Sequence, residues 1–120
     1  MPTLYITPGE TGRWSINVTD ASGGEQPLAL LVQAWLTLKR RFGDADPGVF
    51  QLTLSGSEIA VTDSPAGEME AIAPSAKTAL LGDGERYFWD CRLKFSDGTI
   101  SNPSGLRGEL VAEARVTHAL

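Results

Sequence analysis

The residues that most often carry chemistry are scarce in this sequence. Its single cysteine is Cys91 and its single histidine is His118, which stands close to the C-terminal end of the 120 residues. A serine or cysteine nucleophile needs a positioned base, and chain ends are usually poorly ordered, so we expect no catalytic role for His118. One cysteine and one histidine also fall short of the four ligands of a structural zinc site.

Two groups of carboxylates offer weaker possibilities. In "GDADPG", Asp44 and Asp46 with Gly48 resemble the start of a calcium loop, but the later acidic ligands are missing, so we interpret the segment as a polar turn. Glu68 and Glu70 are spaced to share one strand face, where they would serve acid and base chemistry in a cleft or simply face solvent. We therefore predict a protein that is not an enzyme, with no cofactor and no metal.

The charge and hydropathy of the sequence argue against two further classes of protein, those that bind nucleic acid and those that associate with membranes. The net charge is −5 and the pI about 4.7, which argues against nucleic acid as a partner, because phosphates require a basic face. We interpret the one basic cluster, Lys39, Arg40 and Arg41, as a solvated edge. The longest nearly apolar run, "PLALLVQAWLTL", is too short to span a bilayer, and "MPTLYITPGE" lacks the features of a signal peptide, so we expect no membrane association.

A single cysteine also cannot form an internal disulfide, so packing alone must hold the fold. This usage fits synthesis in a reducing cytoplasm.

The aromatic stretch "GERYFWDCRLKFSDGT" at residues 84–99 has the two-residue period of a half-buried strand. Asp97-Gly98 supplies a tight hairpin turn after it. We predict that Trp89 is buried and Cys91 inert, because both lie on the apolar face. That face comprises Tyr87, Trp89, Cys91, Leu93 and Phe95, and the opposite face comprises Phe88, Asp90, Arg92, Lys94 and Ser96.

The same alternation recurs along the chain and predicts an all-β fold. Inward sets include Trp14, Ile16 and Val18, then Ile59 and Val61, and in the last strand Leu110, Ala112, Ala114 and Val116. Short strands with turn signals about every ten residues are typical of a sandwich or a barrel. We predict one domain over residues 1–120, with strands in residues 3–7, 13–19, 49–54, 58–63, 68–72, 87–95, 99–101 and 109–117.

Two segments do not follow this pattern cleanly. Residues 28–41 alternate like a strand but also place leucines and Trp35 on a helical stripe, and their residue types favour helices. We favour a strand because its neighbours are strands, and Trp35 then points away from the main core. "PSAKTALLGDG" lacks alternation, so we expect one or two helical turns that start with Pro74 at the first helical position and end near Gly82.

Several features of the second half occur in a fixed order. They are a proline-led segment from Pro74 to Leu81, a Gly84 to Tyr87 strand start, the pair Trp89-Asp90, the hairpin turn Asp97-Gly98 and a closing Val116-Thr117. This order resembles the immunoglobulin-like N-terminal domain of the baseplate upper protein of tailed bacteriophages and related small phage tail proteins. In the first half, "GETGRWSINVTDASG" is similar to that domain's opening strand and loop, and "LVQAWLTLKRR" to its long strand.

The resemblance implies an immunoglobulin-like antiparallel β-sandwich of about seven or eight strands with one short helical turn. It also implies a virion structural protein, made in the host cytoplasm, that joins other tail or baseplate subunits in a multi-copy assembly. We expect Trp35 and Phe88 to be anchors of the interface, with a polar rim of Lys39, Arg41, Asp90 and Arg92. The alternative for the two aromatics is a second small core under a loop.

Two other functions stay open at this point. A carbohydrate-binding module of similar fold would use exposed aromatics as a sugar platform and bind glycans as a monomer. A cell-surface adhesin domain would normally carry a signal peptide or tandem copies, which this sequence does not show.

Overall fold

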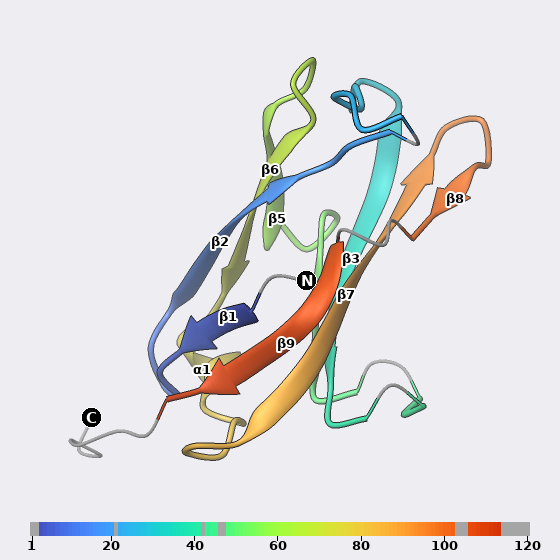
Figure 1. Cartoon of the computed structure of the whole chain (residues 1–120). Helices are drawn as coiled ribbons and strands as arrows, with labels where there is room; N and C mark the ends of the chain where they lie inside the picture. Colours follow the sequence, from blue (N-terminus) through green and yellow to red (C-terminus); the bar gives the residue numbers. More distant parts are fainter. Residues whose placement is uncertain (1–2, 21, 42, 46–47, 103–105, 114–120) are drawn as a thin grey trace.

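Two β-sheets packed face to face form the structure, a computed structural model that describes residues 3–20, 22–41, 43–45, 48–102 and 106–113 (Figure 1). The strands and the one short helix are β1 (Thr3–Ile6), β2 (Gly12–Asn17), β3 (Leu31–Lys39), β4 (Phe50–Thr53), β5 (Ile59–Asp63), β6 (Glu68–Ala73), α1 (Ser75–Thr78), β7 (Arg86–Phe95), β8 (Ile100–Ser101) and β9 (Arg107–Ala112).

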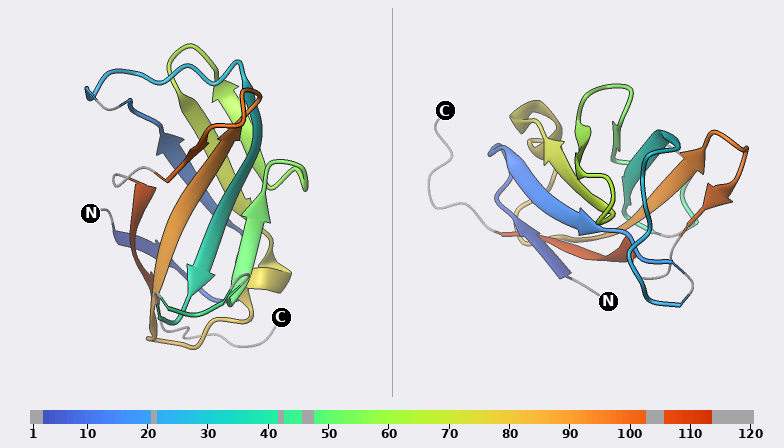
Figure 2. Two further views of the ribbon diagram at one scale, coloured as in Figure 1. Left: turned by 90° about the vertical axis from the view of Figure 1, so that its right-hand side faces the viewer. Right: turned by 90° about the horizontal axis from the view of Figure 1, so that it is seen from above.

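The strand order identifies the architecture. The larger sheet has the order β1-β9-β7-β3-β4, with β8 also paired to β7, and the smaller sheet has the order β2-β6-β5. In an immunoglobulin-like sandwich one sheet contains the second, fifth and fourth strands, and the other contains the seventh, sixth and third. Here β2-β6-β5 correspond to the first group and β9-β7-β3 to the second, and β1 and β4 are additions to the larger sheet. Figure 2 shows the two layers from the side and from above. The predicted β-sandwich is confirmed.

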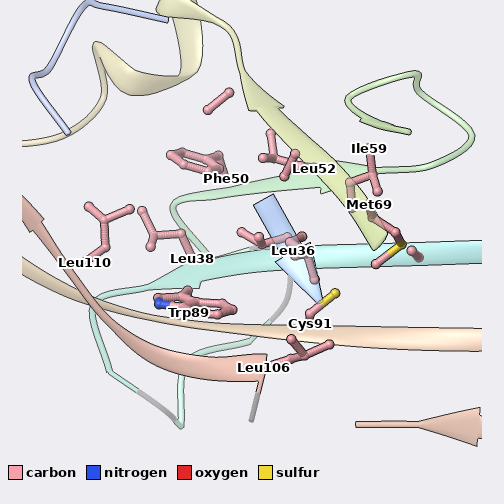
Figure 3. Packing of buried hydrophobic residues seen from close by; sticks show 14 of the residues in the cluster. Leu36, Leu38, Phe50, Leu52, Ile59, Met69, Trp89, Cys91, Leu106 and Leu110 are labelled. Atoms are coloured by element: carbon pink, nitrogen blue, oxygen red, sulfur yellow. The ribbon is translucent and has the colours of Figure 1, made fainter. Parts of the chain in front are cut away.

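The core lies between the layers and follows the predicted alternation. Tyr87, Trp89, Cys91 and Leu93 of β7 point inward, and each is at most 5% exposed. Figure 3 shows Trp89 and Cys91 beside Leu36 and Leu38 of the neighbouring strand β3 and beside Leu106, which precedes β9, with Ile59 and Met69 of the smaller sheet above them. The buried position predicted for Trp89 is therefore confirmed.

The segment that was ambiguous between helix and strand is a strand. β3 pairs with β7 from Leu31 to Lys39 and with β4 on its other side. The helix propensity of its Ala, Leu, Gln and Lys residues amounts to tenths of a kcal/mol per position, which two flanking hydrogen-bonded ladders and a buried apolar face outweigh. Ala34, Leu36 and Leu38 fill the core, so Trp35 points outward as predicted.

The start of β7 is fixed by a hydrogen-bonded tyrosine. The backbone N–H of Gly82 donates to Tyr87 Oη at 2.9 Å, and the same hydroxyl donates to Glu85 Oε2 at 2.9 Å. Immunoglobulin-like folds commonly carry such a tyrosine corner at this strand, where the hydroxyl bonds to backbone a few residues upstream. In antibody domains the second cysteine of the inter-sheet disulfide follows that tyrosine by two residues, and here Trp89 stands at that position.

Three predictions need correction. Val61 was expected inside with Ile59 but is 37% exposed, because it lies on the edge strand of the smaller sheet, although it still stands opposite buried Met69. Pro74 is the residue before α1 rather than its first helical residue, although the turns do continue to Leu81. The last strand begins two residues earlier than predicted, at Arg107.

Some predicted features cannot be compared. Ala114, Val116, Thr117 and His118 lie outside the described residues.

We expect Trp89→Ala to lower the free energy of unfolding by about 3–5 kcal/mol, because truncation leaves a large cavity between the sheets. Chemical denaturation followed by circular dichroism measures this change. The matched control is Ile100→Ala, which truncates a side chain that is 59% exposed and should cost well under about 1 kcal/mol. Equal losses in the two variants would contradict the assignment of Trp89 to the core.

Candidate docking face

The outward surface of the larger sheet gathers most of the residues that the sequence suggested for an interface. Its cross-strand register places Trp35 opposite Arg92, Thr37 opposite Asp90, and Lys39 opposite Phe88. We call this surface the large-sheet face and define it by the outward side chains of β1, β9, β7, β3 and β4: Thr3, Tyr5, Gln33, Trp35, Thr37, Lys39, Gln51, Thr53, Arg86, Phe88, Asp90, Arg92, Lys94, Arg107, Glu109 and Val111.

A hollow of about 370 Å³ lies on this face. Its lining side chains come from three neighbouring strands and comprise Trp35, Thr37, Lys39, Gln51, Asp90 and Arg92. The volume falls at the lower end of the range of small-molecule sites, and one aromatic ring among polar groups is a composition such sites often have. The hollow therefore has the size and lining to receive a side chain of another protein or a small ligand.

The polar floor of the hollow is held by hydrogen bonds. Thr37 is only 5% exposed although it faces outward, and its Oγ1 accepts a hydrogen bond of 2.9 Å from Gln51 Nε2. Asp90 Oδ2 accepts one of 3.2 Å from Asn102 Nδ2. These bonds hold the Thr37 and Asp90 side chains in place. The exposed guanidinium of Arg92, by contrast, has no hydrogen bond or ion pair with any residue that the structure describes.

The two aromatic candidates are half-buried on the open face. Trp35 forms one wall of the hollow, and Phe88 lies between Lys39 of β3 and Glu109 of β9 in the register of the sheet. Both side chains therefore present part of a large apolar ring on a surface that the smaller sheet does not cover.

Arg41 is the one predicted interface residue that the fold separates from the others. It follows the end of β3, and its backbone N–H donates to Asp44 Oδ2 at 3.2 Å in the turn after the strand. Its side chain is exposed but does not line the hollow.

Sequence reasoning missed Thr37 and Gln51. Both alternate outward within their strands, so the pattern placed them on the correct face, but nothing in the sequence showed that β4 pairs with β3. The hydrogen bond between Gln51 and Thr37 depends on the pairing of β4 with β3.

The raised pKa of Cys91, which lies beneath the large-sheet face, is typical of a structural cysteine. Burial raises the pKa of the Cys91 thiol to about 12, and the negative charge of Asp90 adds to the rise. Desolvation also raises the pKa of Tyr87 in the corner at the start of β7. Cys91 is therefore a neutral, buried thiol at physiological pH. Because the thiolate is the reactive form of cysteine, we expect Cys91 to be unreactive.

The described part of the chain shows neither a metal-binding group nor a spanning helix. No three His, Cys, Asp or Glu side chains in it cluster so as to hold a metal ion. Likewise, none of its helices has the length and apolar character needed to cross a membrane.

Comparison with known proteins gives no family. No protein-family model matches the chain, and no curated protein matches it.

We expect the free energy of unfolding to fall with rising pH above about pH 9. The unfolded thiol ionises near its ordinary pKa of about 8.5, whereas native Cys91 keeps its proton until about pH 12, so the native state binds more protons in between. The loss attributable to Cys91 approaches about 1.4 kcal/mol per pH unit. Urea titrations at several pH values, compared with those of Cys91→Ala, isolate this contribution.

The alanine variant is the control because it retains every other titrating group. Parallel pH profiles for both proteins, or rapid modification of native Cys91 by a thiol reagent, would contradict the buried, protonated state.

Proposed function

We propose that this chain is a non-enzymatic structural protein of a tailed bacteriophage, an adaptor that joins other tail, baseplate or fibre proteins through its large-sheet face. The observation that carries the docking role is the pair of half-buried aromatic rings, Trp35 and Phe88, on the uncovered side of the larger sheet. The phage setting is supported by the order of motifs from Pro74 to Val116-Thr117.

Interface energetics favour such an arrangement. Aromatic side chains are over-represented among the residues that contribute most to binding, and they act best when surrounding polar groups exclude water around them. Here Lys39, Asp90 and Arg92 surround Trp35, and Glu109 lies beside Phe88. The charged groups would orient the partner and speed its encounter more than they strengthen the complex.

The test replaces each anchor by serine. We expect Trp35→Ser and Phe88→Ser to remain folded, since neither ring belongs to the core between the sheets, and to weaken incorporation into particles at least about tenfold. The tagged chain, expressed during phage production in place of the unmodified one, is quantified in purified particles. Leu80→Ser is the matched control, because Leu80 is 57% exposed and lies after α1, outside the strands that form the large-sheet face.

Two results would contradict the docking role. If the serine variants unfold, the rings belong to a core and the contact surface lies elsewhere. If they enter particles as well as the Leu80→Ser control does, the large-sheet face is not the docking surface.

Carbohydrate binding is the second candidate, and the hollow is the observation that favours it. An indole ring can stack on the apolar side of a sugar, while Thr37, Gln51 and Asp90 offer hydrogen-bonding groups nearby. This function requires a monomer that binds an oligosaccharide and loses that binding in Trp35→Ser. A glycan array distinguishes it from assembly, because an assembly module shows no such binding.

A further inference from the structure

The two outward surfaces of the sandwich carry opposite charge. The large-sheet face has five cations and two anions: Lys39, Arg86, Arg92, Lys94 and Arg107 against Asp90 and Glu109. We call the outward surface of β2, β6 and β5 the small-sheet face. It has three anions and one cation: Asp63, Glu68 and Glu70 against Arg13. Because the whole chain has a net charge of −5, the cationic surface is an exception to its overall sign.

The charge of the large-sheet face is only partly neutralised within the chain. Arg86 forms an ion pair of 3.1 Å with Glu109. Arg92 and Lys94 are exposed, lie two positions apart on the same side of β7, and make no ion pair with any described residue. Two neighbouring positive charges are therefore available to a partner.

The small-sheet face has a complementary excess. Asp63 and Glu68 stand directly opposite each other in the ladder between β5 and β6, and like charges at such positions are destabilising. Within the described part of the chain neither carboxylate forms an ion pair, whereas Glu70 is 3.4 Å from Arg13. A cationic surface placed here would relieve the repulsion between Asp63 and Glu68.

We propose that the large-sheet face of one copy docks on the small-sheet face of the next copy. This inference rests on the proposed assembly function and names a second copy of the chain as a partner. Apolar contact is also available, because Ala60 and Ile72 lie among the acids of the small-sheet face and can receive the rings of Trp35 and Phe88. Contact between two identical faces brings like charges together and is disfavoured.

The geometry of such contacts extends beyond a dimer. The outward surfaces of two packed sheets point in opposite directions, as the side and top views show (Figure 2). A contact between unlike faces leaves one free face at each end, so further copies add until a ring closes or a filament grows. The expected product is a ring or a stack, which suits a multi-copy assembly.

Sedimentation velocity of the purified chain tests the stacking directly. At low ionic strength we expect species larger than a dimer, whose share increases with protein concentration. In 1 M salt the screening length falls to about 3 Å, from about 8 Å at 0.15 M, so the association should weaken at least about tenfold. A chain that stays monomeric at about 1 mM and low salt, or that stops at a dimer, would overturn the proposal.

Charge reversal identifies the two faces. The first variant carries Arg92→Glu and Lys94→Glu, which makes both faces acidic, and the second carries Glu68→Lys and Glu70→Lys, which makes both faces basic. Each variant alone should remain folded and associate at least about tenfold more weakly than the wild-type chain. An equimolar mixture should associate again, because every contact then joins an acidic face to a basic one.

The control for the second variant changes net charge equally without touching either face. Glu25→Lys with Glu113→Lys alters two exposed positions outside the strands, and it should associate like the wild-type chain. Unchanged association of either face variant, or a mixture that stays monomeric, would show that these faces do not meet.

Particle incorporation separates this proposal from the assembly function on which it rests. A monomeric wild-type chain whose Phe88→Ser variant is lost from particles would refute self-stacking and leave the adaptor function intact. A chain that stacks by the charge rule but is absent from particles would support stacking and refute the phage assembly function.

Discussion

The antiparallel ladder between β3 and β7 is the constraint on which both the core and the candidate docking face depend. It runs from Leu31 opposite Phe95 to Lys39 opposite Phe88, with one irregularity near Gln33. Because side chains alternate across a sheet, a slip of one residue would move Trp89 to solvent and Phe88 into the core. The register therefore decides at once which rings pack in the core and which lie on the outward surface of the larger sheet.

Trp89 and the corner formed by Tyr87 hold this ladder against the smaller sheet without a disulfide. The tryptophan stands where an antibody domain has its second bridging cysteine, and the free Cys91 two residues later is a buried apolar filler with a raised pKa. The indole Nε1 of Trp89 is buried with no hydrogen-bond acceptor among the described residues, which costs free energy that the burial of the large ring offsets. Packing thus replaces the covalent link.

The two outer surfaces of the sandwich differ in charge. The acidic residues lie mainly on the small-sheet face and in loops, while β7 alone contributes Arg86, Arg92 and Lys94 to the large-sheet face. A surface pair is usually worth less than about 1 kcal/mol, so this separation adds little to stability. In the proposed stacking, its effect is on orientation and partner choice, since complementary potentials guide unlike faces together and keep like faces apart.

Alternation in the sequence was sufficient to predict the β-sandwich, the burial of Trp89 and Cys91, and the outward direction of Trp35 and Phe88, because a period of two is a local property of a strand. It was insufficient for Val61, whose exposure depends on the place of β5 at the edge of its sheet. It also could not predict that Trp35, Gln51 and Arg92, distant in the chain, share one hollow, or that Asp63 stands opposite Glu68. Pairing between strands is decided by the tertiary structure, because it depends on how the whole chain buries its apolar faces together.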